Sequence, residues 1–149
     1  MTTQNLPKTF PINHDDYHAE YIGRLDNGRQ FFLTNPFVPQ MANESGCEFV
    51  ALFYFDNKGI FLEAKIENLG PRNLLDQKVS ERLFQAYLDE IADGEFTDIE
   101  IAPFEIERFG TKFGFIPRPL EDEEDEWGIE FHPGNYMAFF APWDGDYDT

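Results

Sequence analysis

A chain of 149 residues fits one domain, and folding buries roughly two-thirds of the surface that such a chain exposes when unfolded. Its 17 Phe, 6 Tyr and 2 Trp predict a packed core and argue against disorder, because disordered chains are poor in aromatic residues. The 29 acidic residues outnumber the 11 Lys and Arg, which gives a formal net charge of −18. This charge repels nucleic acids and anionic membranes. It favours association with a basic partner protein. Solubility alone is the competing explanation of this charge.

The compartment is predicted from cysteine usage and from the apolar segments. The single cysteine, Cys47, excludes an intrachain disulfide and a site built from several cysteines. A lone thiol is typical of a reducing compartment. Residues 1–16 contain no apolar signal segment, and no run of about 18 apolar residues occurs. We therefore expect a cytoplasmic protein with no membrane partner. From the net charge we expect no direct nucleic-acid partner, and we also expect no cofactor. The sequence leaves the oligomeric state open.

The first third of the chain predicts a hairpin and a loop. Residues 1–16 form an extended lead-in with little periodicity. Strands over 17–25 and 29–34 follow, joined by a turn at Asp26-Asn27-Gly28. Residues 35–46 are rich in Pro, Asn, Ser and Gly and predict a loop of about 12 residues, a length at which loops are often functional.

The central stretch, EFVALFYFDNKGIFLEAKIEN at 48–68, predicts a second hairpin. Residues 48–55 are almost continuously apolar, as in a strand covered on both faces. Residues 56–59 supply the turn, and residues 60–68 alternate with a period of two. We expect one face of this strand to carry Ile60, Leu62, Ala64 and Ile66, and the other Phe61, Glu63, Lys65 and Glu67.

One helix is predicted over residues 76–92, because apolar residues recur every four positions from Val79 to Ile91. Asp76 is a candidate N-cap, and Gly94 lies where a glycine closes a helix.

The strand pattern resumes after the helix. It covers residues 96–108 and changes phase at Pro103, which predicts a bend in an edge strand. A turn at 109–111 leads into a strand over 112–116, which Pro117-Arg118-Pro119 ends. Two short strands follow, over 127–131 and 136–140. The predicted fold is a single α+β domain over residues 1–149, a twisted antiparallel sheet of about six to eight strands with the helix packed on it.

Two acidic segments are candidates for binding. The run at 121–126 has the composition of a solvated loop, with cation binding or phosphate mimicry as the alternatives. In the tail, Asp144, Asp146 and Asp148 have the spacing that opens a calcium loop, but Gly145 is misplaced for one and no bidentate Glu follows. We expect Trp143 and Tyr147 to hold the tail on the core, with the acids in water.

Catalytic patterns are sparse. His14 and His18 are expected at the start of a strand, where a separation of four residues spans about 13 Å and does not favour a shared metal. His132 precedes Pro133-Gly134 and is expected in a turn. Cys47 is expected to be a small apolar filler at the entry to the buried strand. Neither a nucleophile elbow, a zinc-binding H-E-x-x-H nor a phosphate-binding glycine loop occurs.

Several stretches resemble a known family. Residues 21–24 (YIGR) and 28–31 (GRQF), residues 98–104 (DIEIAPF) and the ending at 142–149 (PWDGDYDT) carry the resemblance. Together they resemble small, largely uncharacterised bacterial proteins, some labelled formate hydrogenlyase regulatory protein. The resemblance implies a bacterial cytoplasmic protein and transfers no catalytic residue.

The sequence predicts a non-enzymatic acidic protein-interaction module, a small regulator or an immunity-type inhibitor of a basic partner. The candidate interface residues are Trp143, Asp144, Asp146, Tyr147 and Asp148, because aromatic anchors dominate interface energetics. One alternative is a small-molecule-binding protein or enzyme whose pocket lies between sheet and tail and is lined by the 35–46 loop and His14. The other is a nucleic-acid mimic that inhibits a DNA-binding protein.

Overall fold

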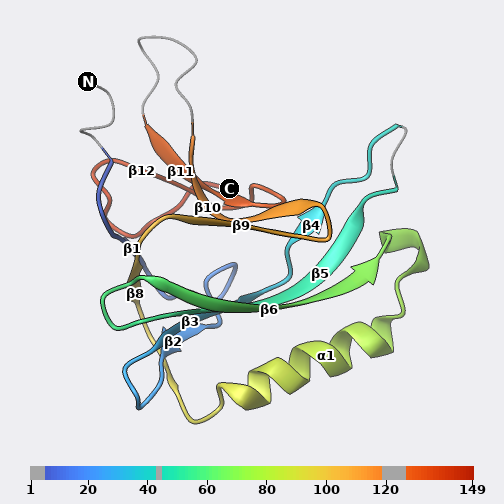
Figure 1. Cartoon of the computed structure of the whole chain (residues 1–149), viewed down its shortest axis with the longest axis horizontal. Helices are drawn as coiled ribbons and strands as arrows, with labels where there is room; N and C mark the ends of the chain where they lie inside the picture. The colour runs from blue at the N-terminus through green and yellow to red at the C-terminus, as the bar shows by residue number, and fades with distance from the viewer. Residues whose placement is uncertain (1–5, 43–44, 119–126) are drawn as a thin grey trace.

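The computed structural model describes residues 6–42, 45–118 and 127–149 (Figure 1). At its centre is β5 (Cys47–Phe55), in which every residue from Phe49 to Phe55 is buried. Successive side chains of a strand point to opposite faces, so β5 contributes to two separate cores. The prediction of a strand covered on both faces is confirmed.

β5 lies inside a six-stranded antiparallel sheet. The strand order is β6 (Phe61–Gly70), β5, β3 (Gln30–Thr34), β2 (Ile22–Arg24) and β7 (Glu95–Phe96), while β4 (Phe37–Val38) pairs with the start of β5. In the turn between β5 and β6 the carboxylate of Asp56 accepts hydrogen bonds from the backbone N–H groups of Lys58 and Ile60, both at 2.9 Å. Both predicted hairpins are therefore present.

The predicted alternation along β6 is wrong at its start. The register of β6 against β5 shifts next to Phe55, which pairs with Phe61, and Leu62 is the additional residue of the resulting bulge. A bulge breaks the alternation of faces along the strand. Phe61 therefore packs against the core, while Ile60 and Leu62 are exposed.

The helix α1 (Gln77–Glu90) covers one face of this sheet, as Figure 1 shows. The carboxylate of Asp76 accepts hydrogen bonds from the backbone N–H groups of Lys78 (3.0 Å) and Val79 (3.3 Å), which confirms the predicted N-cap. The core between helix and sheet contains Phe31, Leu33, Val50, Leu52, Tyr54 and Ile91, with Leu83, Phe84, Tyr87 and Leu88 of the helix packed on it.

Gly94 follows the helix for a reason other than the predicted one. It does not adopt the left-handed conformation of a closing glycine. A Cβ at this position would lie 2.9 Å from the carbonyl oxygen of Arg24 and 3.0 Å from the side chain of Leu25. The close approach of the chain to β2 therefore requires the glycine.

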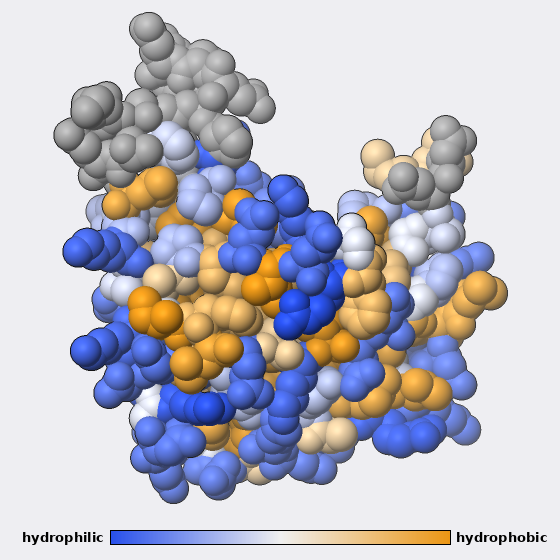
Figure 2. All heavy atoms as spheres, viewed as in Figure 1, coloured by the Kyte–Doolittle hydropathy of each residue, from blue (hydrophilic) through white to orange (hydrophobic). Residues whose placement is uncertain are grey.

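A second antiparallel sheet covers the other face. Its order is β12 (Ala138–Phe140), β11 (Gly128–His132), β10 (Thr111–Arg118) and β9 (Phe104–Arg108). The core between the sheets is built largely from Phe10, Phe32, Phe49, Phe53, Phe55, Phe113, Phe115, Phe131 and Phe139. Phe61 and Phe104 stack at 4.4 Å between ring centroids and join the edge strands β6 and β9. Figure 2 shows hydrophobic side chains among hydrophilic ones on the face that carries these strands.

Pro103 and Pro117 have different effects on the strands in which they were expected to cause a bend or an end. Pro103 separates β8 (Ile99–Ile101) from β9, and β7, β8 and β9 belong to three different sheets, so the predicted single strand over 96–108 with a bend is wrong, although β9 is an edge strand. Pro117 does not end its strand as predicted, because it lies within β10 and pairs with Ile129 of β11. The β9 ladder ends at Phe115, so no backbone donor is needed at Pro117 on that side.

The chain before β2 also differs from the prediction. The expected lead-in contains β1 (Phe10–Ile12), which pairs with β8 and buries Phe10 and Ile12 completely. The expected strand over 17–25 is reduced to β2, and a turn precedes it. The fold is α+β with one main helix, as predicted, but the strands of the described residues are divided among three antiparallel sheets, of which the largest has six strands.

Candidate interaction face and groove

Backbone hydrogen bonds tie the C-terminal tail, residues 142–149, to the domain. The backbone N–H of Asn13 donates to the carbonyl of Gly145 (3.0 Å), and Ala138 and Asp148 exchange two backbone hydrogen bonds (2.9 and 2.8 Å). Gly145 has a φ of +96°, and a Cβ at this position would overlap the Asn13 side chain. The tail therefore follows a fixed path over β1 and β12.

Two aromatic residues anchor the tail. Trp143 and Tyr147 are half-buried against the larger core, while Asp144, Asp146 and Asp148 are exposed. The carboxylate of Asp144 accepts a hydrogen bond from the backbone N–H of Asp146 (3.1 Å). Within the described ranges, no group of three His, Cys, Asp or Glu side chains is arranged to hold a metal ion.

Tyr147 joins the tail to the turn before β2. Its hydroxyl donates to the carboxylate of Asp15 (2.6 Å) and accepts from the backbone N–H of His18 (3.1 Å). The same carboxylate accepts from the backbone N–H groups of Tyr17 (2.9 Å) and Ala19 (3.0 Å). Burial raises the pKa of Asp15, but the hydrogen bonds together outweigh burial and hold that pKa below its ordinary value. Burial raises the pKa of the Tyr147 hydroxyl.

Tyr17 is an exposed aromatic residue outside the predicted candidates. It was expected to begin the strand over 17–25, but it lies on the turn before β2 and is 66% exposed. Its ring lies 3.7 Å from that of His18, measured between centroids. Asp15, two residues earlier, is the signal that predicts a turn here, because Asp side chains bond to the backbone that follows them.

Tyr17 separates two depressions. The first, of about 380 Å³, lies against the tail and is lined by Asn13, Asp146 and Thr149 among others. The second, of about 420 Å³, lies beside the end of β3. We call the second depression the aromatic groove, and its principal lining residues are Tyr17, Glu20, Tyr21, Phe37, Phe84 and Tyr136.

One wall of the aromatic groove is a run of four neighbouring rings. From Tyr17 through His18 and Tyr136 to Phe37, successive centroids lie 3.7, 4.6 and 5.9 Å apart. The hydroxyl groups of Tyr136 and Thr34 share a hydrogen bond of 2.7 Å, which fixes the wall to β3. Burial lowers the pKa of His18, which favours its neutral form.

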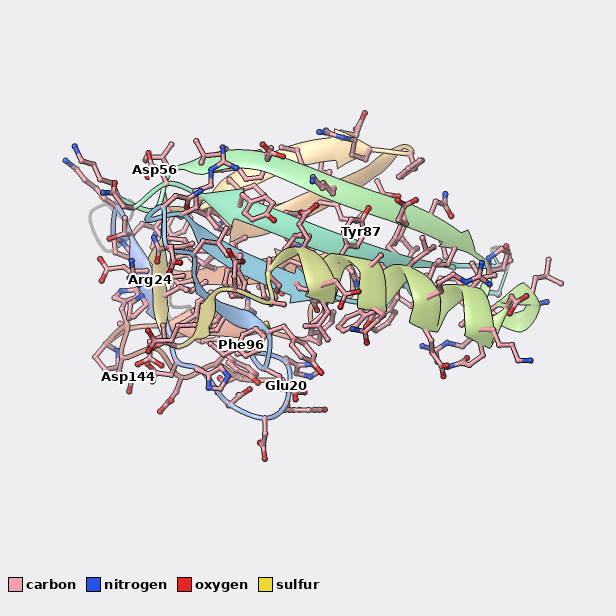
Figure 3. All side chains as sticks on the ribbon, turned by 90° about the horizontal axis from the view of Figure 1, so that it is seen from below. Glu20, Arg24, Asp56, Tyr87, Phe96 and Asp144 are labelled. Atoms are coloured by element: carbon pink, nitrogen blue, oxygen red, sulfur yellow. The ribbon has the colours of Figure 1, made fainter. Side chains whose placement is uncertain are left out.

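Another pair of rings and three charged groups complete the groove. Tyr21 and Phe84 meet edge to face at 5.2 Å and bring α1 into the lining. Arg72 pairs with Glu48 (3.3 Å), and its guanidinium lies 5.8 Å from the centre of the Phe37 ring. Glu20 is exposed at the rim, and Figure 3 shows it on the same side of the molecule as Asp144.

The structure places the 35–46 loop and His14 in different depressions. This segment is not all loop, because Phe37 and Val38 form β4, and residues 37–40 and Ser45 line a hollow of about 160 Å³ together with Cys47 and Arg72. His14 lines the depression against the tail, and its Nε2 lies 2.9 Å from the carbonyl oxygen of Glu20. The small-molecule alternative expects one pocket between sheet and tail that both segments line, and the structure divides these lining residues between two depressions.

The histidines, Cys47 and the acidic run are the remaining candidates from the sequence. His14 precedes the turn before β2 and His18 lies within it, so neither begins a strand, which corrects the expectation. His132 is the last residue of β11 rather than a turn residue, and burial lowers its pKa. Cys47 is half-buried with its Sγ 3.0 Å from Oδ1 of Asn68, and burial raises the pKa of the thiol. The acidic run at 121–126 lies outside the described residues.

Comparisons with known proteins return no relative for this chain. It matches no protein-family model, no curated protein and no solved structure. The resemblance of its ending to the bacterial family named above therefore stays a prediction. In the part of the chain that the structure describes, no helix is both long and apolar enough to cross a membrane.

Proposed function

We propose that the chain is a non-enzymatic interaction module that binds a basic partner protein, as a small cytoplasmic regulator or an immunity-type inhibitor does. The contact surface is the tail face, which we define as Tyr17, Asp144, Asp146 and Asp148. The observation that carries this proposal is the fixed path of the tail, which holds exposed carboxylates on the side of the molecule that also carries an exposed aromatic ring.

A fixed tail favours binding in two ways. Its backbone is held by hydrogen bonds with Asn13 and Ala138, and the carboxylate of Asp146 accepts a hydrogen bond from the Asn13 side chain, so association orders few additional groups. The net charge of −18 raises the rate of encounter with a basic surface. Tyr17 supplies the kind of aromatic contact that dominates interface energetics.

The candidate residues then divide into two roles. Trp143 and Tyr147 hold the tail in place through their packing on the core. Asp144, Asp146 and Asp148 face solvent and contact the partner. Loss of either aromatic residue therefore disturbs the tail itself, while replacement of the acids by Asn removes their charge and keeps the side-chain oxygens that accept hydrogen bonds from Asn13 and from the Asp146 N–H.

The experiment is affinity capture from a lysate of the source cells at low salt, followed by elution with a salt gradient. We expect one basic protein to elute at moderate salt. Its affinity is then measured for the triple variant Asp144→Asn, Asp146→Asn and Asp148→Asn, which we expect to bind at least about tenfold more weakly.

The matched control removes the same charge elsewhere. Glu81→Gln, Asp93→Asn and Glu107→Gln are exposed positions away from the tail, and we expect this triple variant to bind within about twofold of the wild type. If the two triple variants lower the affinity for the captured protein equally, the tail acids act only through the overall net charge. That result would overturn the tail face as the contact surface. Capture of no basic protein would overturn the proposed function.

A further inference from the structure

We propose that the aromatic groove binds an arginine side chain from an extended segment of the partner protein. This inference rests on the proposed function and names the chemistry that the partner presents. The groove, of about 420 Å³, has the size of a small binding pocket.

The first argument is the aromatic lining. The wall from Tyr17 to Phe37 and the pair formed by Tyr21 and Phe84 present ring surfaces to one depression. A planar guanidinium stacks on aromatic faces and is more weakly hydrated than an ammonium group, so arginine fits such a lining better than lysine. The chain already makes one such contact here, since Arg72 lies 5.8 Å from the centre of the Phe37 ring.

The second argument is charge. Arg72 is paired with Glu48, so these two lining charges offset one another. Glu20 remains at the rim as an exposed carboxylate, and a carboxylate accepts two parallel hydrogen bonds from a guanidinium. Burial lowers the pKa of His18 and so disfavours a positive charge on its ring that would oppose the guanidinium. A cationic side chain is therefore attracted, and an anionic ligand is repelled by the surrounding field.

The third argument is continuity with the tail face. Tyr17 lines both the aromatic groove and the depression against the tail. A segment that contacts Asp146 therefore reaches the aromatic groove by passing over a single side chain. An extended strand advances about 3.3 Å per residue, so a short peptide covers both contacts.

The test uses a fluorescein-labelled hexapeptide, Gly-Arg-Gly-Gly-Arg-Gly, and the same peptide with citrulline at both arginine positions. Citrulline keeps the shape of the side chain and removes its charge. We expect the arginine peptide to bind in fluorescence anisotropy and to shift the backbone amide resonances of Tyr21, Thr34 and Asn35 in a ¹⁵N spectrum. The citrulline peptide is expected to bind at least about threefold more weakly.

Variants of the groove locate the site. Glu20→Gln and Phe84→Leu are each expected to weaken the arginine peptide at least about threefold, since they remove the carboxylate and one ring. The matched controls are Glu81→Gln, an exposed acid on α1, and Phe109→Leu, an exposed phenylalanine at the turn between β9 and β10. We expect neither control to change the affinity.

The outcomes separate this inference from the function on which it rests. Amide resonance shifts confined to residues 144–148, or equal affinity for the two peptides, would overturn the arginine site. No binding of the arginine peptide at millimolar concentration would also overturn it. The tail face would still be tested by the affinity of the captured partner for the triple variant. Concentration-dependent shifts without peptide would show a second copy of the chain in the groove and overturn the assignment to a partner.

Discussion

At the scale of single residues, the hydroxyl group of Tyr147 holds the tail to the turn before β2. Tyr147→Phe keeps the ring next to Phe139, at 5.8 Å between centroids, and removes the hydrogen bonds with Asp15 and His18. Because one partner is a carboxylate, we expect the free energy of unfolding to fall by about 1–2 kcal/mol, measured by urea denaturation at pH 7. The control is Tyr17→Phe, whose exposed hydroxyl we expect to contribute nothing measurable.

The pH dependence of the stability that Tyr147→Phe loses shows whether the hydrogen bond to Asp15 is the cause. The pKa of Asp15 in the folded chain lies below that of an unfolded Asp, about 3.9, so its charge stabilises the fold above that pH. This stabilisation is lost as the pH falls through the folded pKa. We therefore expect the difference between the wild type and Tyr147→Phe to be full at neutral pH and to shrink below pH about 4. A difference that stays constant with pH would place the loss in packing instead.

Residue roles were predictable where a local pattern sets them. Asp76 was predicted as a cap because the helix pattern begins directly after it, and the anchoring of Trp143 and Tyr147 followed from aromatic residues that alternate with acids. Tyr17 and Tyr136 were not recognised as neighbours, because a hydrophobic pattern does not show which distant segments meet. The groove that they line forms where the turn before β2 packs against the segment that follows β11, and these two segments are far apart in the sequence.

At the scale of elements, Gln30 joins two sheets. Its buried side-chain amide donates to the carbonyl groups of Asp56 (3.1 Å) and Glu100 (2.8 Å) and accepts from the backbone N–H of Glu100 (2.7 Å). It thereby connects β3 to β8 and to the turn after β5. Gln30→Leu leaves three backbone groups without this partner, and each unpaired buried group costs roughly 1–3 kcal/mol.

We expect Gln30→Leu to lower the free energy of unfolding by about 3 kcal/mol. Thermal and urea denaturation measure this loss. The control is Gln85→Leu on the exposed side of α1, where the amide bonds only to Asp89 (2.8 Å) and the expected change is within about 0.5 kcal/mol. Similar losses in the two variants would show that the connection between the sheets contributes little.

Elements with a strong local signal were predictable, and those defined by distant partners were not. The strand at 48–55, both hairpins and the helix carry composition, turn residues and periodicity within a single segment. β1 has no such pattern because its burial depends on β8, far along the chain. The bulge at Leu62 was likewise hidden, since an unpaired residue on one strand is set by the register against the other.

At the scale of the whole molecule, three layers follow one another: α1, the six-stranded sheet and the four-stranded sheet (Figure 1). Composition and the order of elements predicted an α+β fold. They did not predict the division of strands into separate sheets, because the phase change at Pro103 is compatible with either a bent strand or two strands in different sheets. The phenylalanines gather in the core between the two sheets, to which β5 gives Phe49, Phe53 and Phe55, while its other face gives Val50, Leu52 and Tyr54 to the core under the helix.

The net charge of −18 sets opposite effects of salt on folding and on binding. In the folded chain the acids repel one another, and salt screens this repulsion. Salt also weakens the five ion pairs found among the described residues, but such surface pairs contribute only about 0–1 kcal/mol each. Repulsion therefore dominates, and we expect Tm to rise by a few degrees between about 0.01 M and about 0.5 M NaCl.

Binding of a basic partner changes in the other direction over the same range, because screening removes the attraction that the acids provide. Calorimetry of the free chain and affinity measurements with the captured protein, both across one NaCl series, give the two slopes. A Tm that falls with salt would show that the ion pairs outweigh the repulsion. An affinity that does not change with salt would contradict an acidic contact surface, whatever the effect on stability. Opposite slopes follow from one physical cause, because the salt that screens repulsion among the acids also screens their attraction to a basic surface.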